Sequence, residues 1–571
     1  MLKRISILFL LYTRIGYSQC MIVPMSLEQR VNSASAIIEA EVVNQNCFID
    51  SVSKHIYTLS SLKIFKLFKG TVVDGDVSII TSGGTLGNKM ERVSGLLQLK
   101  QGDIGVFMCE LDIKGFKVVA GVQGFLQYDI VSGTVSDCFT KYPSFSEIHL
   151  LVTSITKLNY KQINPFPFIP SNQKVNSLGI GSIIPSVVSA GTGNSITITG
   201  TSFGANRGAG KVGFKNADNG GQTYIYPIAS QYKKWTDSEI IVEVPTLAGT
   251  GKIQVTNGVT ATSITTLTVS YARTNEVYEE KVISPNLVDM GGGGYVWQLQ
   301  TDFAENKNAS DAFKRALVNW RCTSLVNWTI GDNTAVDVTD KDGINSVRFD
   351  TKRELPQGTL GVTYAYYNSC NGVADWYVSE LDMLYSDTAN WEFGPASAIN
   401  KFDFESVCLH ELGHAQMLGH VINSNDIMHY AIAPGQNLRS IGATNLAGAQ
   451  FVLNESTSPV SCGPSAMELI DVSVCNDVSE AHFSFTGLTI SPNPFTTDCI
   501  ISYEVPYESK VELNIFDVLG NKLANPINAI QQKGKHSYLL SALAMGLSAG
   551  LYIAIIEVDG TVNSNKFLMI K

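Results

Sequence analysis

Residues 405–430 of the chain read ESVCLHELGHAQMLGHVINSNDIMHY. His410 and His414 stand four residues apart in this stretch, so on a helix both imidazoles project from the same face. Glu411 follows His410 directly and places a carboxylate beside the point where the two rings meet. His420 comes six residues after His414, too far along the chain to share that helical face. The chain must therefore turn after the helix if the His420 ring is to meet the other two.

These side chains suit a catalytic zinc ion. Zinc binds neutral imidazole nitrogens, and a catalytic site keeps one coordination position open for water. The metal lowers the pKa of that water, and a neighbouring carboxylate, here Glu411, takes the proton. The alternative is a helix with unrelated surface histidines. The chain has 8 histidines, four of them between residues 410 and 429, and a chance match at all four motif positions is on the order of one in ten thousand.

The stretch resembles the metzincin metalloproteases, whose pattern H-E-x-x-H-x-x-G-x-x-H is followed by a methionine turn beneath the metal. Met428 lies eight residues after His420, a short spacing similar to that of the matrixin branch. The resemblance implies zinc ligands at His410, His414 and His420, the general base at Glu411 and a supporting methionine at Met428.

The chain departs from the family pattern at one place. The family glycine would stand at position 417, where this chain has Met417, and a glycine follows two residues later at Gly419. Because glycine tolerates positive φ, we expect Gly419 to permit the turn that follows the helix. Tyr430 occupies a position similar to a tyrosine that some astacin-like relatives place near the metal, and we assign it no role.

Length and composition indicate an exported protein of several domains. A chain of 571 residues is too long for one hydrophobic core and suggests three to five domains. Charged residues make up 16% and the net charge is −10, which argues against nucleic acid as a partner because phosphate binding needs a basic surface.

Residues 1–19 are interpreted as a signal peptide, with Cys20 leaving a lipoprotein as an alternative. No later stretch is long and apolar enough for a transmembrane helix.

Ten scattered cysteines are compatible with disulfides in an exported protein. The pairings suggested by proximity in sequence are Cys322 with Cys370 and Cys462 with Cys475. Free buried cysteines remain an equal alternative for each of them.

The part before the zinc motif is predicted to be β-rich. Residues 20–155 alternate apolar and polar residues and form an N-terminal β domain that serves as a propeptide or a binding module. In this domain His55 and His149 are isolated and are interpreted as structural. Residues 156–177 carry three prolines and are interpreted as a linker.

Residues 178–272 resemble an IPT/TIG domain, a small immunoglobulin-like sandwich. The positions that carry this resemblance are Gly191, Gly200, Phe203, Gly204, Trp235, Asp237, Pro245 and Gly251. The resemblance implies a spacer or a module that contacts carbohydrate or protein, not one that takes part in catalysis.

The catalytic domain is expected to occupy residues 274–457. SDAFKRALVNWRCTSLVNW predicts a long helix, the zinc helix is expected at about 404–417, and ATNLAGAQFVLN predicts a terminal helix. GTLGVTYAYY and WYVSELDMLY are both candidates for the edge strand that pairs with a bound peptide. Calcium stays open as a second cofactor, because aspartates and backbone carbonyls are sufficient ligands for it.

After a linker at 458–483, residues 484–571 resemble a type IX secretion sorting domain. Its matching positions are Pro492, Asn493, Pro494, Gly520, Gly550, Tyr552 and Lys566. The resemblance implies the type IX secretion machinery as a partner and export through the outer membrane of a bacterium.

The sequence thus predicts a multidomain fold, in which an α+β metzincin-like catalytic domain is combined with all-β modules. The predicted function is a secreted zinc-dependent metalloendopeptidase acting on protein or peptide substrates. The alternatives are a secreted adhesin with a vestigial zinc site and a zinc hydrolase of non-peptide substrates. A further hypothesis is latency, in which the N-terminal domain blocks the cleft; comparing the full chain with one that starts near Thr274 would test it.

Overall fold

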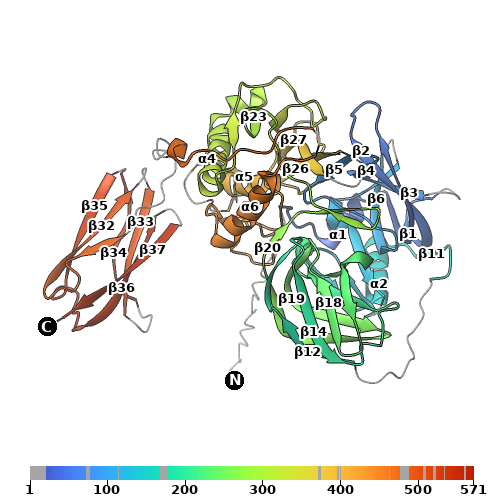
Figure 1. Cartoon of the computed structure of the whole chain (residues 1–571), viewed down its shortest axis with the longest axis horizontal. Coiled ribbons are helices and arrows are strands. Elements are labelled where there is room, and N and C mark those ends of the chain that lie inside the picture. The colour runs from blue at the N-terminus through green and yellow to red at the C-terminus, as the bar shows by residue number, and fades with distance from the viewer. Residues whose placement is uncertain are drawn as a thin grey trace, which may run out of the picture.

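The computed structural model of the chain describes residues 21–72, 77–112, 115–130, 132–166, 178–370, 375–394, 398, 400–461, 463–475, 488–505, 509–517, 522–532, 534–558 and 561–570. The expected signal peptide, Cys20, Cys462 and Gly520 lie outside these residues. The described chain is mostly β-structure with few helices and has several separate hydrophobic cores. Three units lie against one another, and the last unit, residues 488–570, stands apart from them (Figure 1).

Residues 21–166 form a β module with two helices. Its elements are α1 (Leu27–Ser33), β1 (Ala36–Ile49), β2 (Ile56–Lys69), β3 (Val77–Ser82), β6 (Ile104–Asp112), β7 (Gly115–Val118), η1 (Gly121–Gly124), β8 (Phe125–Asp129), β9 (Thr134–Ser136), β10 (Lys141–Tyr142), α2 (Phe145–Thr156) and β11 (Lys161–Gln162). Strands β1, β2, β3, β7 and β6 close into a ring, because β1 pairs with β2 on one side and with β6 on the other. The closed ring has no free edge there, and the strands β4 (Gly84–Leu86) and β5 (Lys89–Val93) leave it to join another sheet.

Residues 179–273 form a two-sheet sandwich. Its elements are β12 (Gly179–Ile184), β13 (Val187–Ala190), β14 (Ser195–Thr201), β15 (Lys211–Asn216), η2 (Ala217–Asn219), β16 (Tyr224–Ile225), η3 (Ala229–Gln231), β17 (Tyr232–Trp235), β18 (Glu239–Glu243), β19 (Ala248–Asn257) and β20 (Val259–Arg273). One sheet has the order β12-β14-β18-β17 and the other β13-β20-β19-β15-β16. Alternating apolar side chains from both sheets fill the core between them.

The third unit combines a mixed sheet with helices. Its elements are β21 (Glu276–Tyr278), β22 (Lys281–Ile283), β23 (Tyr295–Leu299), α3 (Thr301–Glu305), α4 (Lys307–Ser324), β24 (Trp328–Ile330), β25 (Asn345–Phe349), β26 (Gly361–Ser369), β27 (Trp376–Tyr385), β28 (Trp391–Glu392), β29 (Phe402–Asp403), α5 (Phe404–Ala415), β30 (Leu418–Gly419), α6 (Ala443–Ser456) and η4 (Val472–Cys475). The three expected helices are therefore confirmed. Helix α5 packs against α4, whose Trp320 donates its indole hydrogen to the Leu409 carbonyl (2.8 Å).

The sheet of this unit is completed by the N-terminal module. Its strand order is β24-β23-β25-β27-β26-β5-β4, and the last two strands, β5 (Lys89–Val93) and β4 (Gly84–Leu86), come from the N-terminal module. Of the two candidate edge strands, β27 lies inside the sheet, whereas β26 pairs with β5 in the antiparallel direction. The edge of β26 is thus already occupied by the chain's own backbone.

Both suggested disulfide pairings are wrong. Cys322 on α4 is bonded to Cys475, 153 residues later, with an S–S distance of 2.10 Å. Cys370 is also disulfide-bonded. The segment that follows α6 returns along the end of α4, where the Ile470 amide donates to the Leu325 carbonyl (3.1 Å), so the paired cysteines meet through tertiary packing and not through proximity in sequence.

Residues 488–570 form a second sandwich with a core of its own. Its strands are β31 (Thr489–Ser491), β32 (Asp498–Val505), β33 (Ser509–Asp517), β34 (Lys522–Gln531), β35 (Gly534–Ser541), β36 (Gly550–Val558) and β37 (Thr561–Met569). They form one sheet in the order β31-β32-β35 and one in the order β34-β33-β36-β37.

Candidate metal centre

Helix α5 carries His410, Glu411 and His414 into the centre of the third unit. The helix begins at the N-cap Asp403, whose side chain accepts a hydrogen bond from the Ser406 amide (2.8 Å). It ends at Ala415, two residues earlier than expected. The turn that follows is made by Met417, in the left-handed region at φ 61°, and not by Gly419, which lies in β30 without a positive φ.

The three predicted histidines meet at one point. The Nε2–Nε2 distances are 3.0 Å between His410 and His414, 3.2 Å between His414 and His420, and 3.3 Å between His410 and His420. Tetrahedral ligands at the usual zinc–nitrogen distance would be separated by about 3.3 Å. The arrangement fits three ligands of one small cation.

The other nitrogen of each ring is fixed by an oxygen. The acceptors are the Ile427 carbonyl for His410 (2.6 Å), the Leu418 carbonyl for His414 (2.9 Å) and Oδ1 of Asp218 for His420 (2.8 Å). Because these acceptors require a hydrogen on Nδ1, the Nε2 lone pairs face one another. Three lone pairs in contact repel, and a shared cation removes that repulsion, so the residues present fit a zinc ion.

Burial keeps two of these rings neutral. His410 is buried at 1% exposure, and burial followed by the charges of the neighbouring histidines lowers its pKa well below its ordinary value. Burial and the charge of His420 lower the pKa of His414 to about 3. Burial raises the pKa of Asp218, but the hydrogen bond from His420 and the charge of Arg92 outweigh burial and lower it. A neutral imidazole is the form that binds a metal.

Glu411 lies beside the histidines as a buried carboxyl group. Its Oε2 accepts hydrogen bonds from the hydroxyl of Thr363 on β26 (2.9 Å) and from the hydroxyl of Ser94, directly after β5 (3.0 Å). Burial raises the pKa of Glu411 to about 7, although both hydrogen bonds lower it. A carboxyl with a pKa near neutrality suits a group that accepts and later returns a proton.

Met428 lies under the helix between the first two ligands. Its sulfur stands 2.2 Å from the place a Cβ on Gly413 would take, so only glycine fits at position 413. The loop that carries it is fixed by the Met428 amide, which donates to Asp426 (2.8 Å), and by the Val421 amide, which donates to the Met428 carbonyl (2.9 Å). Tyr430 has its hydroxyl group close to Gly220 of the 179–273 sandwich.

Two segments of the N-terminal module occupy the groove on either side of Glu411. On one side, the Ser94 amide donates to the Thr363 carbonyl (3.0 Å), and the Ser94 hydroxyl accepts from the Thr363 amide (2.8 Å). On the other side, the Met21 amide donates to the Tyr430 carbonyl, and the Leu360 amide donates to the Met21 carbonyl, both at 2.7 Å. These backbone groups on both sides of Glu411 are therefore paired within the chain.

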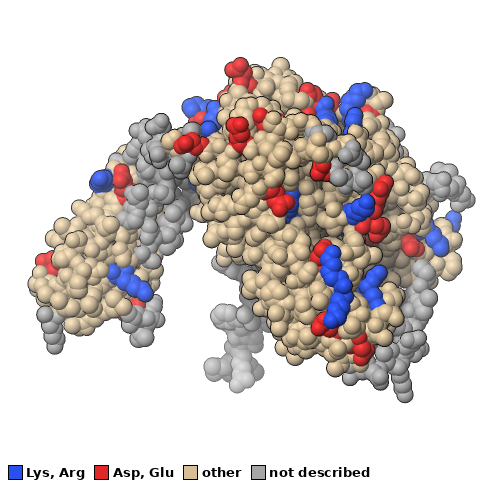
Figure 2. Space-filling view, viewed as in Figure 1, with Lys and Arg blue, Asp and Glu red and all other residues tan. Residues whose placement is uncertain are grey.

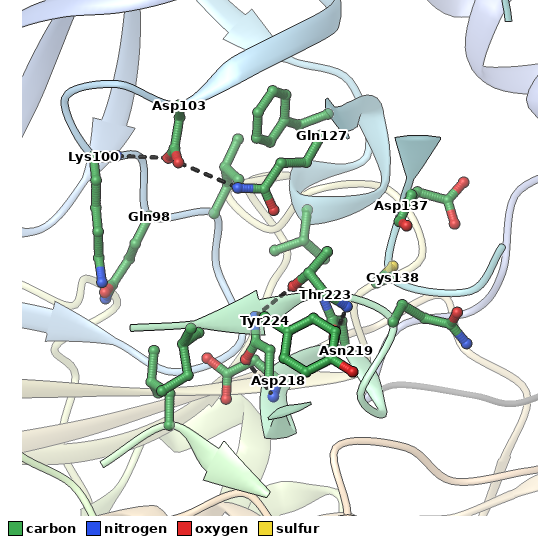
Figure 3. Close-up of a pocket in the computed structure, with 18 of the residues that line it drawn as sticks. Gln98, Lys100, Asp103, Gln127, Asp137, Cys138, Asp218, Asn219, Thr223 and Tyr224 are labelled. Carbon is green, nitrogen blue, oxygen red and sulfur yellow. Dashed lines mark hydrogen bonds between the residues drawn. The ribbon is translucent and has the colours of Figure 1, made fainter. Parts of the chain in front are cut away.

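The space left around the histidines is divided into two cavities. A cavity of about 40 Å³ is lined by the three histidines, Glu411, Ser94 and Met21, and has room for a few water molecules but not for a peptide. A larger cavity of about 520 Å³ lies between the N-terminal module and the sandwich and reaches His414 and His420. Figure 3 shows Asp218, Asn219 and Tyr224 of the sandwich facing Gln127 of the N-terminal module across it.

Sequence reasoning did not identify Ser94, Thr363 or Asp218. Ser94 and Thr363 belong to ordinary strand patterns, and Asp218 lies in another module, 202 residues before His420. No local signal in the sequence distinguishes any of them from a surface or core residue.

Three family models match the chain. Residues 295–447 match matrixin, residues 179–271 match the IPT/TIG domain, and residues 489–571 match the secretion system C-terminal sorting domain. The match over residues 295–447 supports a metallopeptidase, in a chain that also matches an IPT/TIG domain and a sorting domain. The sorting domain marks it for export by type IX secretion, to the cell surface or the extracellular space.

Comparisons with whole proteins add little. No curated protein matches the chain. Among solved structures, OgpA from Akkermansia muciniphila is 10% identical, covers 50% of this chain and 94% of its own, and has a TM-score of 0.11. A tetra-tandem repeat from the extending region of a large adhesion protein is 9% identical, covers 92% of this chain and 97% of its own, and has a TM-score of 0.13.

Two surface properties bear on partners. Among the described residues, no helix is long and apolar enough to cross a membrane. On the face drawn in Figure 2, Lys and Arg side chains are interspersed with Asp and Glu. This mixture agrees with the net charge of −10.

Proposed function

We propose that the chain is a secreted zinc-dependent metalloendopeptidase, with His410, His414 and His420 as the zinc ligands and Glu411 as the general base. The observation that carries this proposal is the convergence of three Nε2 atoms within 3.3 Å of one another in a cavity that Glu411 also lines. The matrixin match over residues 295–447 supports a peptidase. We also propose a metzincin fold for residues 274–457, which the mixed sheet and helices α4, α5 and α6 support.

When bound, a zinc ion supplies Lewis acidity, which acidifies a water molecule and polarises a peptide carbonyl. The substrate lies extended along β26 in the place of β5, held by backbone hydrogen bonds such as those of Thr363. Glu411 takes a proton from the attacking water and passes it to the leaving amine. Thr363 holds the Glu411 carboxyl in position after the strand from the N-terminal module has left.

We further propose that the N-terminal module holds the peptidase in a latent state. Strand β5 occupies the edge of β26, Ser94 is hydrogen-bonded to the proposed base, and Met21 fills the groove beyond it. An extended peptide needs the same backbone groups, so the module and a substrate exclude each other.

His55 links the N-terminal module to the peptidase unit. Its Nδ1 lies 2.8 Å from Oε1 of Glu91 on β5, and its Nε2 lies 3.3 Å from the Thr339 hydroxyl and 3.7 Å from Oδ1 of Asp340. The rings of Tyr57, Tyr364 and Tyr366 surround it. Protonation of His55 therefore bears on the contact between the two units.

Docking of the N-terminal module is expected to weaken as the pH rises through the raised pKa of His55. Burial lowers the pKa of His55, but the hydrogen bond to Glu91 and the charges of Glu91, Asp340 and Glu354 outweigh burial and raise it above 6.5. Because the pKa of His55 is higher in the folded than in the unfolded chain, protonated His55 stabilises the folded state fully below about pH 6.5. This stabilisation is lost as the pH rises through the pKa that His55 has in the folded chain. Between about pH 6 and pH 8 the melting temperature of the native chain should fall by about 1–3 °C more than that of His55→Gln.

His536→Gln is the matched control for this experiment, because His536 is a half-buried histidine of the last sandwich, which stands apart from the contact between the N-terminal module and the peptidase unit. Its melting temperature should follow that of the native chain across the same pH range. Identical curves for His55→Gln and the native chain would show that His55 does not stabilise the contact.

The proposed function is tested by zinc analysis and chelator-reversible cleavage. The purified full chain should hold one zinc ion, and His414→Ala should hold none. Because the native chain is proposed to be latent, casein cleavage is measured in parallel with Ser94→Pro, which weakens the blocking strand. Zinc-dependent cleavage by Ser94→Pro supports the peptidase, whereas a zinc-loaded Ser94→Pro chain without cleavage would favour the adhesin with a vestigial site.

A further inference from the structure

The third proposed zinc ligand differs from the first two in the group that accepts its Nδ1 hydrogen. His410 and His414 donate their Nδ1 hydrogens to the carbonyls of Ile427 and Leu418, which belong to the peptidase unit. His420 instead donates to a carboxylate, Oδ1 of Asp218 at 2.8 Å, which belongs to the IPT/TIG sandwich. The hydrogen-bond acceptors of the three rings are therefore all in place only when the two units are packed together.

Asp218 is itself fixed by the sandwich. It lies in the short helix η2, where its amide donates to the side chain of Asn216 (3.1 Å), and the Ala217 amide donates to the Leu247 carbonyl (2.9 Å). Asn219 closes the loop with a hydrogen bond to the Thr223 hydroxyl (2.7 Å). These contacts fix the backbone from which the Asp218 carboxylate reaches His420.

The segment that carries His420 is joined to the same sandwich by its backbone. Strand β30 pairs with the end of β20, with Gly419 opposite Ala272 and Leu418 opposite Arg273. The Thr274 amide donates to the carbonyl of Met417 (2.7 Å). The sandwich thus positions both the backbone and the ring of the third ligand.

The packing on either side of this strand pair is close. A Cβ on Gly249 would stand 2.6 Å from the Ile422 side chain, and a Cβ on Gly220 would stand 2.5 Å from the hydroxyl oxygen of Tyr430. Such close approach leaves the loop between the zinc helix and Met428 little freedom to shift against the sandwich.

From these contacts we infer that Asp218 is a positioning residue of the zinc site and that the IPT/TIG sandwich is part of the catalytic unit. This inference rests on the proposed zinc site. The carboxylate fixes the tautomer that presents Nε2 to the metal and increases the basicity of the ring, as a hydrogen-bonded carboxylate does for other metal-binding histidines. The half-exposed remainder of the Asp218 side chain faces the cavity of about 520 Å³ (Figure 3).

The experiment measures zinc affinity of the full chain by competition with a chromophoric chelator, so that its result does not depend on peptide cleavage. Asp218→Ala should bind zinc about 10- to 100-fold more weakly than the native chain. Asp218→Asn should lose less, because an amide oxygen still accepts the Nδ1 hydrogen but carries no charge. The cobalt-substituted Asp218→Asn chain should also show a shifted visible absorption band, which a role in folding alone would not produce.

Asp237→Ala is the matched control, because Asp237 is an exposed aspartate of the same sandwich whose side chain accepts a hydrogen bond from the Gly204 amide (3.0 Å). Its zinc affinity should equal that of the native chain. If Asp218→Ala does not fold, the zinc affinity and cobalt spectrum of the nearly isosteric Asp218→Asn chain test the inference. A folded Asp218 variant within about twofold of the native zinc affinity, with an unchanged cobalt spectrum, would overturn the inference. A native chain that binds zinc no better than His414→Ala would instead overturn the proposed function.

Discussion

Peptide cleavage by a Glu411→Gln chain should fall by about 10²–10⁴-fold, measured in the Ser94→Pro background so that the groove is open. The amide of glutamine cannot accept a proton from water at neutral pH, but it keeps the shape of the side chain and can still bond to Thr363. The zinc ligands are not touched by the substitution. Zinc content should therefore remain at one ion per chain while cleavage is lost.

Glu305→Gln provides the matched control for this substitution. Glu305 is an exposed residue at the end of α3 in the same unit and lies outside the groove. Its cleavage rate should match that of the Ser94→Pro parent. Retention of most of the activity in the zinc-loaded Glu411→Gln chain would refute the role of Glu411 as the base.

Weakening the blocking strand should raise the activity of the intact chain. Ser94→Pro removes the amide that donates to Thr363 and the hydroxyl that bonds to Glu411 and to the Thr363 amide. Two to three hydrogen bonds of about 1 kcal/mol each correspond to a shift of about 30- to 150-fold toward the open state. The initial rate on a quenched fluorescent peptide should rise accordingly, with mass spectrometry confirming that the chain is uncut.

Ser94→Ala keeps the backbone amide and loses only the hydroxyl contacts, so its activity should lie between those of the native chain and Ser94→Pro. Ser51→Pro serves as the control, since Ser51 lies in an exposed turn of the same module. If the native and Ser94→Pro chains are both folded and zinc-loaded and cleave at equal rates, the native chain is not latent.

The convergence of the three histidines is largely predictable because the information for it is local. Spacing of four residues on a helix fixes His410 and His414, and the third histidine and Met428 follow within 14 residues of His414. The turn was assigned to the wrong residue, since Gly419 was expected and Met417 adopts the φ of 61°. Tertiary pairing of β30 with β20 explains this, because it draws Gly419 into an extended strand and leaves the turn to the residue before it.

What the sequence did not give is the contribution of distant segments. Strand β5 has an ordinary strand composition, and nothing in it indicates that it leaves its own module to pair with β26. Asp218 likewise has no signal that connects it with His420. Pairings over such separations depend on which surfaces meet in the folded chain, and single-sequence periodicity carries no information about that.

The position of Asp218 also changes how latency should be tested. A chain that starts near Thr274 would lose the N-terminal module, but it would also lose Asp218 and the strand that pairs with β30. Inactivity of such a chain would be uninformative about the block. Substitutions at Ser94 in the full chain separate the two effects, because they leave the sandwich in place.

The insertion of β5 into the peptidase sheet has a consequence for maturation. Its backbone hydrogen bonds to β26, together with the ion pair of Arg92 with Glu276 at 2.7 Å, do not depend on covalent continuity between the two units. A single cut between residues 166 and 178 would therefore yield a dissociable two-fragment complex and not a free enzyme. Its specific activity should then increase on dilution, and added N-terminal fragment should reverse that increase as a tight-binding inhibitor acting in trans.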